Sequence, residues 1–350
     1  MPIYKDEERG TWYCCFYYVD WQGLKKRKTK RGFTKQKDAK EYERAFLDKL
    51  QSNPQMTFAG LVELYIDDMK NRLRQSTMNN KKHMIDTKIL PYFGKIKIGD
   101  IKPTTVRQWQ NKLIGQDYSE TYLKSINNQL CAILNYAVKY YGLRENPCHK
   151  AGSMGRKSAD EMQFWTREEY LKFSNAIEDK PMAHLAYQIL YWCGLRAGEL
   201  LALTRADIDL TSKELSVNKS YQRIEKQDVI TEPKTKKSIR IIAIPNFLCK
   251  EIETYMQTLF DKNPSTRLFT VTKYYLHHEM DRGCKISGVK RIRVHDLRHS
   301  HASLLIELGF SPLLIAERLG HENIETTLNT YSHLYPHKQT ELANTLDTLI

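Results

Sequence analysis

Two arginines, two histidines and one tyrosine stand in short strings whose residue types suit phosphoryl transfer to a phenol. Guanidinium groups can hold a phosphodiester by bidentate hydrogen bonds, and imidazoles can move protons or donate to a non-bridging oxygen. A tyrosine hydroxyl can serve as the attacking oxygen. The order of the strings therefore predicts attack of a phenol on a phosphodiester. The residues that would carry this chemistry are Arg196, His295, Arg298, His321 and Tyr331.

Each string also has a plainer interpretation. Arg196 could pair with Glu199 on the surface of one helix, and a lone tyrosine such as Tyr331 usually packs in a core. His295 and His299 have the i, i+4 spacing of zinc ligands. Asp296, however, stands where the glutamate of a His-Glu-x-x-His motif would follow the first histidine. We therefore expect no metal site there, and helix packing or capping is the stronger alternative.

Local signals predict that helices position the first two strings. Arg196 lies at the start of a predicted helix that runs through Leu203. Backbone amides at such a start, beside a guanidinium, would make a phosphate site. His295 and Arg298 are three residues apart, so they share one face of a second predicted helix.

Helix signals continue to the end of the sequence. Gly320 is the expected left-handed cap that presents His321 beside a helix end. Residues 324–333 are predicted to form the helix that carries Tyr331. Residues 339–350 regain helical spacing, and their apolar stripe must be buried on the same domain or on another copy of the chain. That stripe consists of Leu342, Leu346 and Leu349.

The charge balance favours a polyanionic partner. The 350 residues are enough for two or three domains, and 55 Lys plus Arg against 41 Asp plus Glu give a net charge of +14. This excess fits a nucleic acid, although a merely soluble basic protein would also show it. The seven cysteines lack paired spacing, which indicates free thiols in a reducing cytoplasm. We find no apolar run of membrane-spanning length and no signal-peptide pattern at the start.

Residues 1–50 are predicted to form a small β-plus-helix module. Residues 11–19 are rich in aromatic and β-branched side chains, a basic strand follows over 25–31, and a helix begins after Thr34. Cys14 and Cys15 should point to opposite faces of the first strand. A charged strand can simply protect a sheet edge, but next to aromatics a contact with the DNA major groove is favoured. The candidate DNA-binding residues are Lys25, Lys26, Arg27, Lys28, Lys30 and Arg31.

A helical domain is predicted over residues 56–150, after a linker at 51–55. Its second helix should end at Pro91, and Ser119 should cap its fourth and longest helix. Lys81 and Lys82 lie on an outer face and are candidate DNA contacts.

The last domain is predicted over residues 160–350, after a flexible linker at 150–162. A capping-box signal at Thr166 and Glu169 opens it. Helices dominate, with strand-rich segments at 214–224, 229–233 and 238–245. The expected fold class is therefore multidomain: a small β-plus-helix module, an all-α domain, and a mainly α domain with a small antiparallel sheet.

The motifs around Arg196, His295, Arg298, His321 and Tyr331 resemble those of the tyrosine recombinase (phage integrase) family. The match covers about residues 160–335 of the 350. The helical domain is similar to the core-site DNA-binding domain of that family. The first module resembles the arm-type DNA-binding module of integrases from temperate phages and conjugative transposons of Gram-positive bacteria.

The resemblance implies a catalytic lysine on a β-hairpin. Lys234 aligns best with it, but Lys236 and Lys237 are close enough to leave the assignment open. The stretch between Arg196 and Lys234 is lengthened, and we assign the extra residues to a longer strand pair around 219–228.

The resemblance also implies a reaction that needs no metal ion, ATP or other cofactor. Tyr331 would attack the scissile phosphate and form a 3′-phosphotyrosine, while Arg196 and Arg298 hold the non-bridging oxygens. His321 would add a hydrogen bond. His295 would accept or orient the phenol proton, and Lys234 would protonate the leaving 5′ oxygen. Glu199 and Asp296 would support these groups without reacting.

The expected function is that of a site-specific recombinase that integrates and excises a mobile element in the cytoplasm of a bacterial host, at the nucleoid. Its partners would be double-stranded DNA with core and arm-type sites, and further copies of the chain in a tetramer on DNA. A type IB-like topoisomerase and a non-catalytic DNA-binding regulator are the alternatives. The sequence leaves open the attachment site, a phage or transposon origin, any excision factor or host DNA-bending protein, and docking of the C-terminal helix in cis or in trans.

Overall fold

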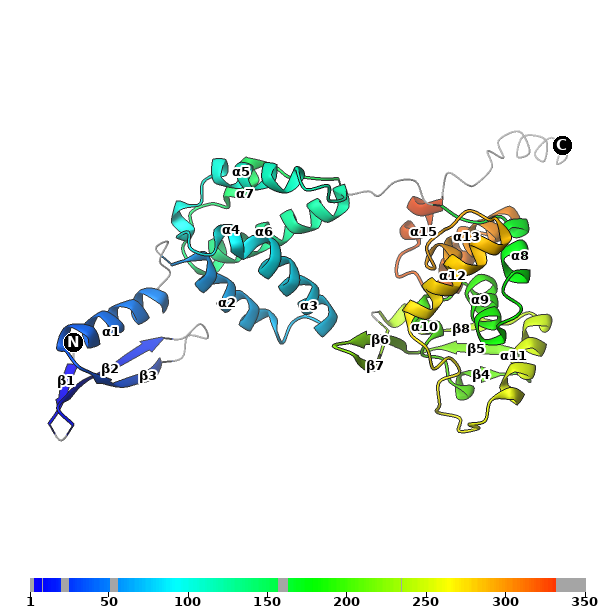
Figure 1. Cartoon of the computed structure of the whole chain (residues 1–350), viewed down its shortest axis with the longest axis horizontal. Helices are drawn as coiled ribbons and strands as arrows, with labels where there is room; N and C mark the ends of the chain where they lie inside the picture. Colours follow the sequence, from blue (N-terminus) through cyan, green and yellow to red (C-terminus); the bar gives the residue numbers. More distant parts are fainter. Residues whose placement is uncertain are drawn as a thin grey trace, which may run out of the picture. The chain divides into compact units, whose positions relative to one another are not determined.

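The computed structural model describes residues 3–7, 9–19, 25–50, 56–156, 163–233 and 235–331. The chain divides into two compact units, Met1–Asp160 and Glu161–Ile350 (Figure 1). The division of the first unit into two separate DNA-binding domains stays a prediction. No helix of the described part is long and apolar enough to cross a membrane.

The first unit begins with a small antiparallel sheet. Its strands are β1 (Ile3–Asp6), β2 (Thr11–Val19) and β3 (Lys25–Phe33), in the order β1-β2-β3, and helix α1 (Gln36–Leu50) follows. Side chains alternate along β2, so Cys14 and Phe16 pack against Ala39 of α1. Cys15 accepts hydrogen bonds on the other face. The expected opposite orientation of Cys14 and Cys15 is confirmed, whereas strand β1 was not predicted.

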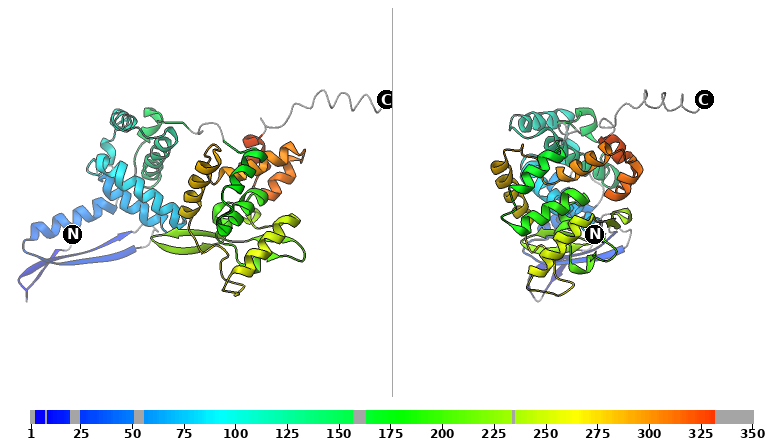
Figure 2. Two further views of the ribbon diagram at one scale, coloured as in Figure 1. Left: turned by 45° about the vertical axis from the view of Figure 1, so that its right-hand side comes forward. Right: turned by 90° about the vertical axis from the view of Figure 1, so that its right-hand side faces the viewer.

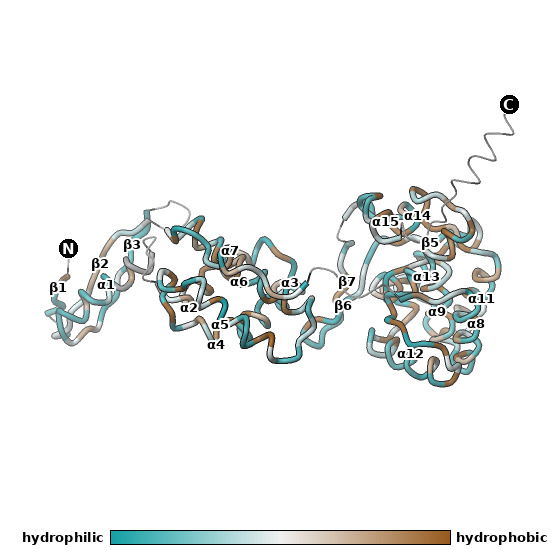
Figure 3. The backbone as a smooth tube through the Cα atoms, turned by 90° about the horizontal axis from the view of Figure 1, so that it is seen from above, coloured by the Kyte–Doolittle hydropathy of each residue, from teal (hydrophilic) through white to brown (hydrophobic). Residues whose placement is uncertain are grey.

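The rest of the first unit is helical and has a hydrophobic core of its own. Trp109, Ile126 and Phe93 are fully buried there, and the alternation of hydrophilic and hydrophobic residues along these helices can be followed in Figure 3. Ser119 caps the longest helix through a hydrogen bond from the amide of Tyr122. The helices are α2 (Phe58–Met69), α3 (Gln75–Met84), α4 (Leu90–Phe93), α5 (Pro103–Ile114), α6 (Glu120–Tyr140) and α7 (Pro147–Ala151), with a 3₁₀ turn at Ile98–Asp100.

Pro91 does not end the second predicted helix. The chain passes from α3 through a π-helical turn, Ile85–Ile89, into α4, which continues to Phe93. Proline lacks an amide hydrogen and its ring would meet the carbonyl four residues back in a regular helix. The wider π turn accommodates that missing hydrogen bond.

The second unit is mainly helical and has one large core. Helix α9 (Pro181–Cys193) lies at its centre with most of its side chains buried, and Tyr170 of α8 (Arg167–Asn175) stacks on Tyr191 of α9 with 3.6 Å between ring centroids. The capping box at Thr166 and Glu169 is confirmed. The remaining helices are α10 (Ala197–Leu200), α11 (Asn246–Thr258), α12 (Lys273–Ser287), α13 (Asp296–Glu307), α14 (Pro312–Leu319) and α15 (Ile324–Tyr331).

Two small antiparallel sheets interrupt these helices. One has the order β4-β5-β8 and joins Ile208–Asp209, Glu214–Val217 and Arg240–Ala243. The other is a hairpin of β6 (Ser220–Ile224) and β7 (Gln227–Thr231), which projects from the unit (Figures 1 and 2). The predicted segment 214–224 is thus two strands in two sheets, and the hairpin is the expected longer strand pair. 3₁₀ turns occur at Arg205–Asp207 and Lys236–Ser238.

Candidate active site

The site is built around a buried carboxylate at the start of α10. Gly194 takes a left-handed conformation (φ 65°) that ends α9, and the chain turns so that Arg196 becomes the N-cap residue of α10. Glu199 is 4% exposed. Its Oε1 accepts a hydrogen bond from Arg196 Nη1 at 2.7 Å, and its Oε2 accepts one from the Arg196 amide at 3.0 Å. The helix ends at Leu200, earlier than the predicted Leu203.

Arg240 of β8 is a second partner of this carboxylate and was not among the predicted site residues. Its Nη2 donates to Glu199 Oε2 at 2.9 Å, and its Nε donates to the carbonyl oxygen of Arg318 at 2.8 Å. The Arg240 side chain is 6% exposed. The run Ile239-Arg-Ile-Ile-Ala-Ile244 offered a signal, because in a strand Arg240 shares a face with Ile242 and Ile244, and an arginine on an apolar face needs a polar partner.

Arg298 is fixed from two sides. It is 2% exposed, and its Nη1 donates to the carbonyl oxygen of Gly194 at 2.8 Å. Its Nη2 donates to the carbonyl oxygen of Leu319 at the end of α14. Burial and the charge of Arg196 lower the pKa of Arg298 to about 9, so its guanidinium stays charged at neutral pH.

The C-terminal end of α14 gathers these arginines. The carbonyls of Arg318 and Leu319 accept from Arg240 and Arg298, as the negative end of a helix dipole favours. Gly320 follows as the left-handed cap (φ 66°), which confirms the expected cap, and His321 comes next. His321 Nδ1 lies 2.7 Å from Thr327 Oγ1 of α15. Burial and Arg298 lower the pKa of His321 to about 4.

Tyr331 ends α15 and is buried. It is 1% exposed and packs in a small cluster with Ala302, Ile315 and Leu319. Its hydroxyl oxygen lies 2.6 Å from Nδ1 of His299. Burial raises the pKa of Tyr331 to about 12, and the charge of Arg298 offsets only part of that rise. The expected helix over 324–333 thus carries Tyr331 as its last described residue.

The histidine beside the phenol is His299, whereas His295 was expected in that place. His295 is the N-cap residue of α13 and is exposed, and its ring centroid lies 5.2 Å from that of His299. His295 is the cap before the first turn of α13. His299 follows four residues later, about one helical turn further on, where its ring meets Tyr331 of α15. Burial and His295 lower the pKa of His299 to about 4. Partial loss of solvent around the His295 ring, together with the charges of Arg298 and Arg196, lowers the pKa of His295.

Asp296 supports the start of α13, and its carboxylate binds the residue that leads into this helix. It is 2% exposed and accepts hydrogen bonds from the amide of Arg293 at 2.9 Å and from Arg293 Nη2 at 2.8 Å. Its role is therefore to fix the turn that leads into His295.

The lysine loop, residues 232–239 between β7 and β8, is only partly described. Lys234 lies outside the described residues, and so does the side chain of Lys236. Lys237 Nζ donates to the carbonyl oxygen of Glu322 at 2.9 Å, next to His321. The choice among the three lysines stays open.

The electrostatics of the site depend on the Glu199 carboxylate. Burial alone would raise the pKa of Glu199, but Arg240, Arg196 and Arg298 lower it to about 2. The carboxylate is therefore charged at neutral pH and offsets part of the repulsion among three neighbouring arginines. In the described part of the chain, no group of three or more His, Cys, Asp or Glu side chains could hold a metal ion.

The basic residues of β3 are divided between the two faces of the β1-β2-β3 sheet. On the face away from α1, Arg27 Nε donates to Cys15 Sγ at 2.9 Å, and Lys25 and Arg31 lie over the rings of Tyr17 and Tyr13. On the other face, Lys28 lies over the ring of Phe46. The remaining candidates on β3, Lys26 and Lys30, pair across the strands with Tyr18 and Cys14.

The two candidate DNA-binding lysines of the helical part differ: Lys82 is exposed, and Lys81 makes a hydrogen bond within the protein. Lys82 is exposed on α3. Lys81 Nζ donates to Gln129 Oε1 of α6 at 2.7 Å, so its charge also links two helices.

Three protein-family descriptions match successive parts of the chain. Residues 163–338 match the phage integrase family, residues 57–114 match the phage integrase N-terminal SAM-like domain, and residues 2–50 match an arm DNA-binding domain.

Individual relatives agree with this assignment. The chain is 33% identical over 319 residues to the ICEBs1 integrase of Bacillus subtilis strain 168, which covers 87% of this chain and 86% of that protein. Its fold is similar to that of the Tn1549 transposon integrase in complex with transposon right end DNA, with a TM-score of 0.69 at 18% identity over 84% of this chain and 99% of the other. A lambda integrase dimer bound to a core site gives 0.62 at 17% identity, over 96% of this chain and 95% of the other. The expected fold class and family are confirmed, and this chain belongs to the phage integrase family, the tyrosine-type site-specific recombinases that integrate and excise DNA.

Proposed function

We propose that this recombinase cuts and rejoins duplex DNA through a covalent bond between Tyr331 and a 3′ phosphate, without a metal ion, ATP or another cofactor. The observation that carries the proposal is that Arg196 and Arg298 are both held beside the turn between α9 and α10. Arg196 is held by Glu199, and Arg298 is held by the ends of α9 and α14. Two fixed guanidiniums at one place suit a phosphodiester whose charge increases during the reaction.

The two arginines would divide the work. The Arg196 side chain is 37% exposed, so it can meet a phosphate from solvent. Arg298 has committed one hydrogen of each terminal nitrogen to a backbone carbonyl, which leaves the other donors of its planar group for a non-bridging oxygen. His321 follows the α14 cap and would donate a further hydrogen bond to the same phosphate.

Neutral histidines would handle the phenol proton. The low pKa of His299, about 4, keeps its ring neutral at pH 7, so Nδ1 can accept the proton of the Tyr331 hydroxyl. The oxygen–phosphorus bond then forms as the bond to the 5′ oxygen breaks, and Lys234 would give that oxygen its proton. His295 stands beside His299 and would orient it or pass the proton on. Because Tyr331 is 1% exposed, α15 must shift before the hydroxyl can reach DNA.

The first unit would bind DNA at two kinds of site. Residues 1–50 would read arm-type sites through the face of the sheet that carries Lys25, Arg27 and Arg31 among aromatic rings. An antiparallel ribbon of this kind fits the major groove. Residues 56–150 would bind the core site together with the catalytic domain at 160–350, with Lys82 among the phosphate contacts.

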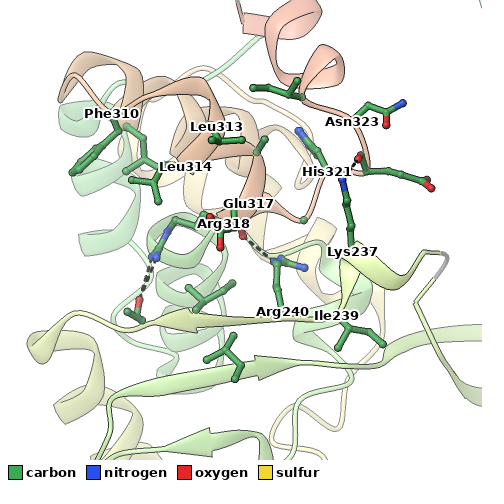
Figure 4. A pocket seen from close by; sticks show the side chains of 18 of the residues that line it. Lys237, Ile239, Arg240, Phe310, Leu313, Leu314, Glu317, Arg318, His321 and Asn323 are labelled. Carbon is green, nitrogen blue, oxygen red and sulfur yellow. Dashed lines mark hydrogen bonds between the residues drawn. The ribbon is translucent and has the colours of Figure 1, made fainter.

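Assembly into a tetramer on DNA would use an apolar groove between β8 and α14 (Figure 4). Ile241 is 64% exposed and Leu313 is 65% exposed, and Phe310 and Leu314 line the same groove. Residues 339–350 lie outside the described part, but their sequence supplies a matching stripe of leucines. We propose that this segment of one subunit docks in the groove of its neighbour, and that any excision factor or host DNA-bending protein acts on the assembled complex.

A nicked core-site duplex tests the chemistry directly, since loss of the short strand after cleavage traps the covalent complex. Wild-type protein should give an adduct that survives denaturation, with the same yield in the presence of EDTA. Tyr331→Phe should bind the duplex equally well and give no adduct, because only the hydroxyl is removed. An adduct with Tyr331→Phe, or a loss of wild-type adduct on chelation, would contradict the proposal.

A further inference from the structure

We propose that Arg240 is a positioning residue for strand cleavage, which sets the Arg196 guanidinium and the His321 loop at one phosphate by binding Glu199 and the end of α14 at the same time. The inference rests on the proposed function of the site. It assigns to Arg240 a role through other groups, and no contact with DNA.

The contacts of Arg240 join separate pieces of the site. Its Nη2 and Nη1 lie 2.9 and 3.4 Å from the two oxygens of Glu199, whose other cation is Arg196. Its Nε donates to the carbonyl oxygen of Arg318, one residue before the carbonyl that holds Arg298. Figure 4 shows Arg240 reaching from β8 toward the end of α14. The Arg240 side chain therefore links β8, on which it lies, to both α10 and α14.

Arg240 also limits the approach of the loop that carries His321. A side chain at Gly320 would place its Cβ 3.0 Å from Arg240 Cδ and 3.0 Å from the carbonyl oxygen of Lys237. The lysine loop, Arg240 and the glycine before His321 are thus in close contact. A shift of Arg240 would move His321 and the β8 end of the lysine loop together.

A salt bridge that served only stability would not need this geometry. Glu279 is such a case in the same unit, because it is fully buried and bound by Lys180 at 2.7 Å and by Arg282 at 2.7 Å, away from the reactive residues. Arg318 is a second comparison. It links α14 to β8 through the carbonyl oxygen of Ala243 at 3.3 Å, without a contact to Glu199.

Charge neutralisation gives the proposal a measurable consequence. The charged groups that face Glu199 are Arg196 at its own helix start, Arg240 from β8 and Arg298 from α13. Arg240 is first among the groups that lower the pKa of this buried carboxyl. Without Arg240, burial should dominate and Glu199 should protonate at a higher pH, which would release Arg196.

The test compares cleavage of the nicked duplex across pH in Arg240→Gln, Arg240→Lys and wild type. Arg240→Gln should bind core DNA as wild type does and form the covalent complex roughly ten- to a hundredfold more slowly. As the pH is lowered, its cleavage activity should begin to fall at a higher pH than that of wild type. Arg240→Lys should lose activity at the same low pH as wild type and have an intermediate rate, because lysine keeps the charge but cannot reach both Glu199 and the Arg318 carbonyl. Adding Glu199→Gln to Arg240→Gln should remove the shifted fall in activity at low pH, since no carboxyl remains to titrate.

Arg282→Gln and Arg318→Gln are the matched controls, and their pH profiles should keep the wild-type shape even where the protein is less stable. A shift of the same size in either control, or an unshifted profile in Arg240→Gln, would show that Arg240 is only a structural anchor. The ionisation can also be read without DNA, from the carboxyl ¹³C signal of Glu199, which should titrate at a higher pH in Arg240→Gln. Absence of a wild-type adduct would instead refute the proposed chemistry, and the carboxyl titration would still decide the role of Arg240.

Discussion

At the scale of single residues, burial sets the protonation states of the site. His299 and His321 have pKa values of about 4, because burial and nearby positive groups oppose their protonation. Burial also holds Tyr331 protonated with a pKa of about 12, although the charge of Arg298 offsets part of that rise. The phenol and its neighbouring imidazole are therefore both neutral at pH 7, and the two groups share a hydrogen bond.

The same low values predict acid sensitivity of the second unit. A histidine with an unfolded pKa of 6.5 and a folded pKa of about 4 stabilises the fold fully above pH 6.5. That contribution is lost as pH falls from 6.5 toward 4, at no more than about 1.4 kcal/mol per pH unit for each such histidine. Urea unfolding of the full chain, followed by the fluorescence of Trp165 and Trp192, should show this slope. His299→Gln should flatten it, whereas His149→Gln, an exposed position in the first unit, should not; equal slopes in all three proteins would contradict the assignment.

At the scale of elements, the C-terminal end of α14 holds several residues of the site in place. Two consecutive carbonyls there bind Arg240 and Arg298, and the left-handed Gly320 turns the chain toward His321. The helix is short, so its position depends on these side-chain hydrogen bonds and on its contact with β8.

Gly320→Ala should therefore cost more than the ordinary penalty of a left-handed alanine. Gly309 is the matched control, because it also has a positive φ (83°) but would place a Cβ in open space. Gly309→Ala should lower the free energy of unfolding by about 1 kcal/mol. Gly320→Ala should lower it further and slow covalent-complex formation, since its Cβ would press on Arg240 and Lys237. Similar unfolding energies and rates in the two variants would show that the packing around Gly320 can adjust freely.

At the scale of the whole molecule, the family assignment covers the chain from the arm-like sheet to the catalytic unit. The two proposed DNA-binding regions ahead of the catalytic unit would allow one protein to hold a distant site and the cleavage site together. Binding through linked modules raises the effective concentration of the second site and needs no new contact in either module.

Removal of residues 1–50 should abolish binding to the distal class of site and leave cleavage at the core site intact. Gel shifts with separate arm and core duplexes, with the nicked-duplex assay alongside, measure both. Affinity for the arm duplex should fall by about one log unit per log unit of salt for each phosphate contacted. Equal loss at both duplexes would place this module in the core-site clamp.

Disruption of the groove or of the tail should block assembly without blocking DNA binding. Ile241→Asp with Leu313→Asp on one side, and Leu342→Asp with Leu346→Asp on the other, should each give protein that binds core DNA but forms no synaptic complex in sedimentation experiments. Phe260→Asp is the control, because Phe260 is fully exposed and lies outside the groove. Normal tetramers in either double variant would show that the tail packs on its own subunit.

Local signals in the sequence were enough to predict the family, the residues that its motifs mark and many of the helices and strands. Periodicity and capping signals depend on neighbours a few positions away, so the strand at 11–19, the cap at Ser119 and the left-handed Gly320 were predictable. Which side chains meet became visible in the folded chain. It paired Tyr331 with His299, brought Arg240 to Glu199 over 41 positions, and divided 214–224 between two sheets. Such contacts depend on the packing of whole elements against one another, which a local pattern of residues does not encode.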